Sequence, residues 1–397
     1  MLSTRTSIAR LFFSAISVLL APPSEGFLAG PPSSSSFIAS LHGIFAAKDA
    51  VSSSVNADIL PRARRRRLQS SVVKQPKRRQ LSPPFPNGLC GGSLVVLPPE
   101  QTYGYNEEDN AYLTAASSGD ATSILLPPRP ISVWLPPSYE ASGRKRHRVI
   151  YVHDGQNAID DADSWTGSSW RMAGALTRLA ERGALDTGYD DVDPLPILVL
   201  LPSADGDFVP GMRRRHLEYG EGVHGEHHAD FIAERLMPLI NDRFRTVTEA
   251  EGAMAIGTSM GGQASLHLLL RHPTMFGGAA CLSPAFQPAT IASVATSGPD
   301  LLKSKNIYID NGGDDENANV RVPMFDLFDH ITPKAQWNPG YFWLDTQLQP
   351  AIDATRATLD FHKVEYCYRK FPGGRHNERE WAKRIDLPLI HLLGKKK

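Results

Sequence analysis

The sequence is poor in the residues that mark several protein classes. It has three cysteines among 397 residues, at Cys90, Cys281 and Cys367. They are far apart and form no Cys-x-x-Cys pair, so a structural zinc site is not expected and a disulfide framework is not indicated. Cys281 and Cys367 lie in apolar or alternating runs, and we expect both to be buried, unreactive thiols.

Long apolar runs and an excess of one charge are also missing. The apolar run at residues 11–21 is too short to span a bilayer. The formal net charge is zero, with 42 basic and 42 acidic residues. We therefore expect neither stable membrane insertion nor a nucleic-acid partner. The balance hides an asymmetry, because residues 1–80 carry 12 Lys/Arg and 3 Asp/Glu, and the remainder carries 30 basic and 39 acidic residues.

The basic N-terminus has the composition of a targeting segment. Arg5 and Arg10 precede the apolar run, and a Ser-, Ala- and Arg-rich tract follows it. This order predicts a signal peptide and then a disordered basic tract up to residue 80. It resembles the bipartite plastid presequence of algae with secondary plastids, in which Phe27 would lie at the cleavage point. The alternative is a secreted protein with a basic propeptide cut near residues 64–67.

The rest of the chain predicts an extended arm followed by one catalytic domain. Residues 81–128 are rich in Pro, Gly and Ser and read as an arm or an irregular lead-in strand. From residue 129 onward, short apolar runs alternate with segments of helical spacing, which indicates an α/β domain with a mainly parallel central sheet and helices on both faces. The expected strands are residues 131–135, 148–152, 196–201, 252–256, 278–282, 306–310 and 364–371, and the expected helices are 170–182, 229–243, 261–271, 349–361 and 378–389.

A Gly-x-Ser-x-Gly motif supplies the candidate nucleophile. Residues 257–261 read Gly-Thr-Ser-Met-Gly, between a short apolar strand and a helix. That context is typical of the nucleophile elbow of the α/β-hydrolase fold. Ser259 would be held in strained backbone geometry, and the N–H of Met260 would be one donor to the oxyanion. The competing interpretation is a chance glycine–serine turn.

The partners of this serine should follow it in the order acid, then histidine. His376 follows the expected strand 364–371 in a glycine-containing loop, which places it better than His330, His362 or His391. The acid should follow strand 306–310. Asp315 is the first choice and Asp314 the second, with Asp310 and Glu316 as further alternatives.

Several ordered motifs together resemble the putative esterase family of α/β hydrolases, which includes enterochelin-esterase-like and S-formylglutathione-hydrolase-like enzymes. The resemblance covers about residues 130–393. It rests on the elbow and on motifs at residues 133–139, 151–157, 215–219, 230–236, 241–246, 282–286 and 372–378. It implies that the N–H of Gln156 is the second oxyanion donor, and it favours Asp315 as the acid.

The expected reaction is two-step acyl transfer from a small-molecule carboxylic ester or thioester to water. Ser259, Asp315 and His376 would form the triad, and no cofactor or metal is needed. Two alternatives use the same fold: an acyltransferase, and a binding protein without catalysis. The sequence leaves the oligomeric state open.

Three other features have a structural and a functional interpretation. The group His224, Glu226, His227 and His228 lacks the spacing of a metalloprotease site and is expected to be a pocket rim or a solvated loop. Arg213–Arg215 would bind an anionic substrate group or lie on a solvated face. Trp165 and Trp170 would line the acyl pocket or pack in the core.

Overall fold

The computed structural model describes residues 83–106, 111–112, 126–141, 143–185, 189–313 and 344–394. The chain divides into two units, residues 1–69 and 70–397, and all described residues belong to the second. The expected targeting segment and its cleavage points lie outside the described residues. Within the described part of the chain, none of the helices has the length and apolar character needed to cross a bilayer.

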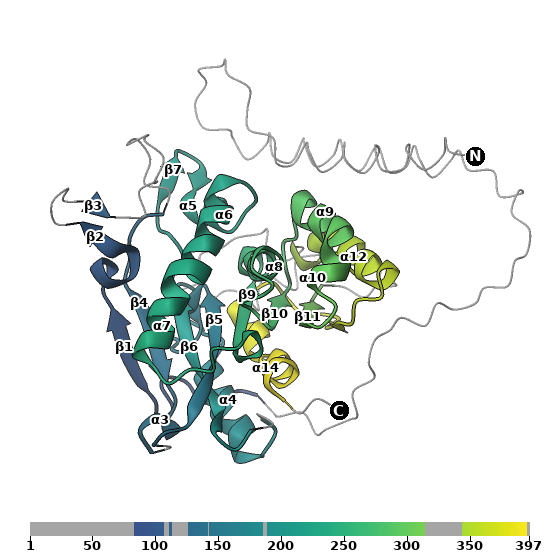
Figure 1. The fold of residues 1–397 in the computed structure, drawn as a ribbon. Coiled ribbons are helices and arrows are strands. Elements are labelled where there is room, and N and C mark those ends of the chain that lie inside the picture. The colour runs from purple at the N-terminus through teal and green to yellow at the C-terminus, as the bar shows by residue number, and fades with distance from the viewer. Residues whose placement is uncertain are drawn as a thin grey trace, which may run out of the picture. The chain divides into compact units, whose positions relative to one another are not determined.

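A central sheet of eight strands organises the second unit (Figure 1). Six neighbouring strands run parallel, and β4 and then β1 add to one edge in antiparallel pairing. In spatial order the strands are β1 (Ser93–Leu97), β4 (Ile131–Leu135), β6 (Val192–Leu201), β5 (Arg146–His153), β9 (Ala253–Thr258), β10 (Gly278–Leu282), β11 (Asn306–Asn311) and β12 (Cys367–Lys370). The predicted α/β class and mainly parallel sheet are confirmed.

Apolar side chains on both faces of the strands explain why helices cover the sheet on both sides. Every residue of β9 and β10 is buried, which is the pattern of a parallel strand enclosed between two helical layers. One face packs against α6 (Val223–Asp230), the π-helix η3 (Phe231–Leu236), α7 (Met237–Arg243), α8 (Met260–Arg271), α9 (Pro288–Thr296) and α12 (Leu344–Phe361). The other face packs against α4 (Met172–Glu181), α13 (Glu378–Ala382) and α14 (Asp386–Leu393).

Short elements connect this framework. They are the π-helix η1 (Glu100–Gly104), β2 (Tyr105–Asn106), β3 (Ala111–Tyr112), α3 (Ser138–Ala141), the 3-10 helix η2 (Gly155–Asn157), β7 (Asp207–Val209), β8 (Met212–Arg213), α5 (Arg214–Glu218), the 3-10 helix η4 (Ala250–Gly252) and α10 (Gly298–Leu301). Two of them, η2 and α5, contribute to the candidate site described below.

Three helices differ clearly from the sequence-based expectation, and proline explains one of the differences. The helix expected at residues 229–243 is formed by the end of α6, by η3 and by α7. The helix expected at residues 349–361 begins earlier, at Leu344, and retains Pro350 inside it. The helix expected at residues 378–389 is divided into α13 and α14. Pro388 lies in the first turn of α14. Proline has no backbone N–H, and in a first turn this costs no intrahelical hydrogen bond, so Pro388 favours the start of a new helix here.

The lead-in segment is part of the packed structure. Strand β1 pairs with β4 over its whole length. Phe85 is buried, and the indole N–H of Trp134 donates to the carbonyl of Leu89 at 3.0 Å. Because Trp134 is fully buried, this carbonyl satisfies a polar group that would otherwise lack a partner.

The two expected structural cysteines are buried. Cys281 lies in β10 and Cys367 in β12. Burial raises the pKa of both thiols, so they stay protonated at neutral pH. Cys90 is half-buried in the lead-in segment.

We expect a chain that begins at residue 83 to match the full-length protein in stability, because residues 1–80 lack a core-forming pattern. A chain that begins at residue 98 should lose about 3 kcal/mol or more of unfolding free energy. It lacks the buried Phe85 ring, worth about 2 kcal/mol, and leaves the Trp134 indole unpaired, which costs about 1 kcal/mol. Urea unfolding of the full-length protein and of the two shortened chains measures these free energies. Equal midpoints and slopes for the chains that begin at residues 83 and 98 would contradict the expected loss.

Candidate active site

Ser259 occupies a sharp turn between β9 and α8. Its backbone has φ 56° and ψ −124°, a conformation that is strained for a residue with a side chain. The turn is held from both sides. The Ser259 N–H donates to the carbonyl of Leu282 at 2.9 Å, and its own carbonyl accepts from the N–H groups of Gly262 and Ala285 at 3.0 Å each. The expected nucleophile elbow is therefore present in the backbone geometry.

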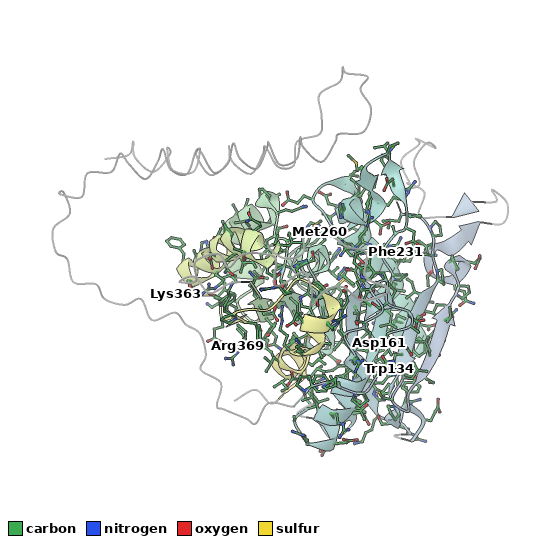
Figure 2. The ribbon with its side chains drawn as sticks, turned by 180° about the vertical axis from the view of Figure 1, so that it is seen from behind. Trp134, Asp161, Phe231, Met260, Lys363 and Arg369 are labelled. Atoms are coloured by element: carbon green, nitrogen blue, oxygen red, sulfur yellow. The ribbon has the colours of Figure 1, made fainter. Side chains whose placement is uncertain are left out.

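Close packing at this turn explains its glycines. A Cβ atom on Gly257 would lie 2.4 Å from the carbonyl carbon of Gly261. A Cβ atom on Gly262 would lie 3.1 Å from Pro284. Helix α8 begins at Met260, so the N–H at this first helical position has no intrahelical acceptor, whereas those of Gly262 and Gln263 donate to the Ser259 carbonyl. Figure 2 labels Met260, the first residue of α8, among the side chains of the molecule.

The loop that carries Gln156 follows β5 and is held rigidly. Asp154 has φ 55° and is buried, and its carboxylate accepts two hydrogen bonds of 2.7 Å from Arg215. The side-chain amide of Gln156 is tied to Ser203, as donor at 3.0 Å and as acceptor at 3.2 Å. A Cβ atom on Gly155 would lie 2.5 Å from the backbone of Leu200, so this loop sits directly on β6.

The basic cluster at Arg213–Arg215 supplies one of the clamps on this loop. Arg215 stacks on the ring of Tyr219 at 5.0 Å while it binds Asp154. The hydroxyl of Tyr219 is 3.0 Å from the N–H of Asp154 and accepts its hydrogen bond. Arg215 therefore orients the loop and is committed to a carboxylate of its own chain. The sequence-based alternative of an anion-binding residue does not fit Arg215.

His376 follows β12, as expected, and is paired with a carboxylate. Its Nδ1 lies 2.7 Å from Oδ1 of Asp345, and both side chains are buried. The His376 ring also packs edge-on against Trp381, with ring centroids 5.0 Å apart. Because Nδ1 is bound to this carboxylate, Nε2 is the ring nitrogen that would exchange a proton with a nucleophile.

Asp345 is a residue that the sequence analysis missed. It lies in the first turn of α12, some thirty residues beyond the loop where the acid was expected. Asp315, Asp314 and Glu316 lie outside the described residues. Asp310, the remaining alternative, is bound to Arg384 through both carboxylate oxygens at 3.1 and 3.2 Å. Among the described residues, the carboxylate that pairs with His376 is therefore that of Asp345, and Asp315 stays a prediction.

Two glycines make room for the Asp345–His376 pair. A Cβ atom on Gly312 would lie 2.2 Å from Oδ2 of Asp345. Gly313 has φ 79° and exchanges backbone hydrogen bonds of 2.8 Å with Gly373 and Gly374. The end of β11 is thereby joined to the histidine loop.

The environment of Asp345 keeps its carboxylate ionised. Burial raises its pKa, but the hydrogen bond and charge of His376, the charge of Arg384 and the hydroxyl of Ser283 together hold that pKa below its ordinary value. A depressed pKa stabilises the fold above the ordinary value near 3.8. That contribution is lost as the pH falls through the folded-state pKa.

The two tryptophans have different environments. Trp170 is fully buried and packs against Trp381, as in the core interpretation. Trp165 is 52% exposed, and its indole N–H donates to the buried carboxylate of Glu378 at 2.9 Å. The backbone N–H of Trp165 is 3.3 Å from the side-chain oxygen of Asn157. Trp165 therefore links the loop of Gln156 to the histidine loop.

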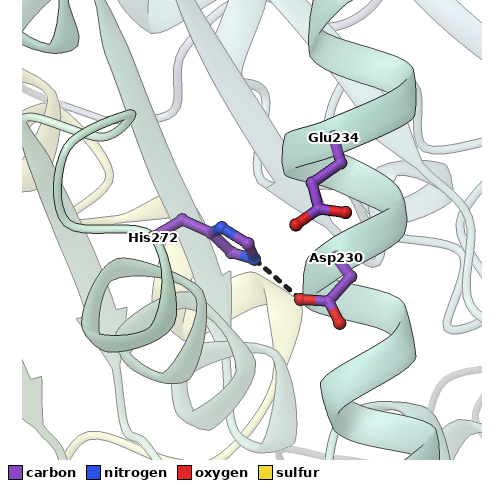
Figure 3. Close-up of side chains that lie close together, drawn as sticks. All are labelled: Asp230, Glu234 and His272. Carbon is purple, nitrogen blue, oxygen red and sulfur yellow. Dashed lines mark hydrogen bonds and ion pairs between the residues drawn. The ribbon is translucent and has the colours of Figure 1, made fainter.

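One group of potential metal ligands occurs in the described part of the chain. Asp230, Glu234 and His272 bring their ligand atoms within 4.8 Å of one another (Figure 3). Asp230 lies 2.9 Å from Nε2 of His272 and accepts two further hydrogen bonds, of 2.5 and 2.8 Å, from Arg271. The guanidinium already neutralises this carboxylate, so the group is better described as an ion-paired surface cluster.

The family model described as "Putative esterase" matches residues 123–392. Two curated relatives from Bacillus subtilis (strain 168) are uncharacterized proteins. YbbA is 25% identical over 158 residues, which is 40% of this chain and 57% of the relative, and YjcH is 33% identical over 123 residues, which is 31% and 50%. The chain thus spans little more than half the length of the curated relatives it matches.

Solved structures similar to this chain include two esterases. A ferulic acid esterase has a TM-score of 0.47 and 15% identity, covering 75% of this chain and 98% of that one. The enterobactin esterase of Shigella flexneri has a TM-score of 0.45 and 16% identity, covering 76% of this chain and 59% of that one.

We expect Gly312→Ala to lower the turnover of p-nitrophenyl acetate by about 10²-fold, because the added methyl group would displace Asp345 from His376. Misplacement of a catalytic group by about 1 Å has a cost of that order. Gly298→Ala is the matched control, since its Cβ would make only ordinary contacts, 3.4 Å or longer. Full activity in Gly312→Ala would show that Asp345 is not needed at its observed position.

Proposed function

The chain belongs to the putative esterase family, and from that premise we propose that it hydrolyses carboxylic esters through a covalent acyl-enzyme. Ser259 is the nucleophile, His376 the general base and acid, and Asp345 the residue that orients the histidine. Gln156 and Met260 supply the backbone N–H groups that bind the oxyanion.

The backbone conformation of Ser259 is the observation that carries this proposal. Strained geometry at a non-glycine residue persists only where its surroundings enforce it, and it concentrates at functional sites. The strain at Ser259 is enforced by glycine contacts on one side and by the Leu282 and Ala285 hydrogen bonds on the other. A turn between a buried strand and a helix N-terminus presents the hydroxyl at the carboxyl edge of the sheet.

The Asp345–His376 pair gives the serine its base. An ionised carboxylate on Nδ1 fixes the tautomer in which Nε2 accepts a proton, and it stabilises the imidazolium that forms. The short distance of 2.7 Å and the burial of both side chains support a strong, charge-assisted hydrogen bond. His376 lies after β12, two strands beyond β10, whose end contacts Ser259.

The reaction proceeds in two balanced steps. The Ser259 oxygen attacks the ester carbonyl carbon while its proton moves to His376, and the carbonyl oxygen becomes an anion held by the two N–H groups. The intermediate collapses, and the leaving alkoxide takes the proton from His376. A water molecule then loses a proton to His376 and attacks the acyl-enzyme, which releases the carboxylic acid and restores Ser259.

The rigid loop at Gln156 suits this chemistry. Oxyanion donors are effective only if they are fixed before negative charge develops. The bidentate Asp154–Arg215 pair and the Gln156–Ser203 hydrogen bonds hold the loop against β6. Rates measured across esters of different acyl groups and alcohols, and across thioesters, identify the preferred substrate.

We expect Ser259→Ala to abolish hydrolysis of p-nitrophenyl acetate, a loss on the order of 10⁶-fold in kcat, since the variant lacks the attacking oxygen. Asp345→Asn should lose about 10⁴-fold, because an amide can donate to Nδ1 and so select the wrong tautomer. Asp353→Asn, a partly exposed carboxylate on the same helix α12, is the control and should retain its rate.

Melting temperatures of all three variants should be measured beside the rates. A Ser259→Ala protein that remains folded and keeps a rate within tenfold of the parent would refute the proposed nucleophile. A folded Asp345→Asn protein with near-parent activity would refute Asp345 as the triad acid and would favour an acid at residues 314–316.

A further inference from the structure

A buried polar cluster lies directly behind the Asp345–His376 pair. Its members are Ser283, which follows β10, Asp310 in β11, and Trp381 and Arg384 from the C-terminal helical region. None of these four residues is more than 3% exposed. Asp310 and Arg384 form a two-oxygen ion pair. Burying such an ion pair costs desolvation free energy, so we asked which role it has beside the Asp345–His376 pair.

Ser283 is the junction of this cluster. Its hydroxyl oxygen accepts from the guanidinium of Arg384 at 2.9 Å and from the indole N–H of Trp381 at 3.2 Å. Its backbone N–H donates to Asp310, with the carboxylate oxygen at 3.1 Å and the carbonyl at 3.0 Å. A serine hydroxyl has two lone pairs and one proton, so both acceptor positions are filled and only the proton remains to be given.

Asp345 has a matching requirement. Its Oδ1 atom binds His376, but its Oδ2 atom is buried and lacks a donor at full hydrogen-bond geometry among the described residues. A buried carboxylate oxygen without a donor costs free energy and leaves the carboxylate free to rotate. A Cβ atom on Gly312 would lie 2.2 Å from Oδ2 of Asp345 and 2.9 Å from the Gly374 carbonyl carbon. One on Gly374 would lie 3.2 Å from Arg384, which itself binds Ser283. In keeping with this placement, the charge of Arg384 and the hydroxyl of Ser283 lower the pKa of Asp345, after the larger effects of burial and His376.

We propose that Ser283 is a positioning residue of the active site, whose hydroxyl proton is donated to Asp345 while Arg384, held by Asp310, turns the hydroxyl toward it. This inference rests on the proposed function, because it assigns a role to the carboxylate that orients His376. Two donors on the oxygen leave one direction for the proton. The carboxylate is then held from both sides, by Ser283 and by His376.

The backbone of Ser283 supports this role. Its φ is 42°, in the left-handed region that residues with a side chain rarely adopt. The strain places the hydroxyl between the ends of two strands and the C-terminal helices. The structural alternative is that Ser283 serves only as an acceptor for Arg384 and Trp381, in which case its proton has no effect on the site.

Ser283→Gly separates these alternatives. Glycine adopts the left-handed conformation without strain, so the backbone is retained while the hydroxyl is lost. We expect kcat to fall about 10- to 100-fold, the value of one hydrogen bond to a charged group. KM should stay within about twofold, because Ser283 is placed against Asp345 and not against substrate. As the pH is lowered, the variant should lose activity at a higher pH than the parent does. The reason is that Asp345 without its donor is protonated more easily.

Tyr308→Phe is the matched control. It removes a 3.2 Å hydrogen bond to Asp310 within the same buried cluster, but leaves Ser283 and both of its donors in place. Its kcat and its acid-side pH dependence should equal those of the parent. A fall in kcat of the same size in both variants, with no movement of the pH profile in Ser283→Gly, would overturn the proposal. So would unchanged kcat in a folded Ser283→Gly protein.

A spectroscopic measurement separates this inference from the proposed function. The Nδ1 proton of His376, bonded to Asp345, should give a low-field proton NMR resonance that needs no substrate to be seen. We expect Ser283→Gly to move this resonance and Tyr308→Phe to leave it in place. If the resonance moves but the parent hydrolyses no ester, the positioning role stands and the proposed function fails. If the parent hydrolyses esters but the resonance does not move, the positioning role fails alone.

Discussion

The strained turn at Ser259 is the constraint on which the rest of the structure depends. It can form only where β9 ends inside a parallel sheet and α8 starts at once, with glycine on both sides to permit the contacts. The next strand, β10, and the segment after it complete the turn: the carbonyl of Leu282 accepts from the Ser259 N–H, and the N–H of Ala285 donates to the Ser259 carbonyl. The sheet therefore fixes the conformation of one residue, so that the proposed nucleophile would be held in position before any substrate arrives.

Buried charge pairs transmit that rigidity to the two loops beside the turn. Asp154 and Arg215 hold the loop of Gln156, and Asp310 and Arg384 lie behind Asp345 and His376. Each pair joins segments far apart in the sequence. Ion pairs of this kind stabilise a fold little compared with apolar packing, and their value here is in fixing direction.

The sequence was sufficient for the sheet and for two of the three proposed triad residues, but not for the acid. Ser259 and His376 follow strands whose apolar runs are readable, so their places at one edge of the sheet could be predicted. Asp345 does not directly follow any of the expected strands, and it lies at the start of a helix whose onset was expected at Gln349. Helix α12 begins earlier, with Pro350 inside it, and its first turn carries Asp345.

The central claim is that Ser259 forms a covalent bond to the acyl group of the substrate. The most direct measurement is reaction of the full chain with a fluorophosphonate, followed by intact mass and peptide mapping. The account predicts one adduct, located at Ser259 in the peptide that joins β9 to α8, and none in the Ser259→Ala protein. An adduct at another residue, or a folded parent protein that does not react, would contradict it.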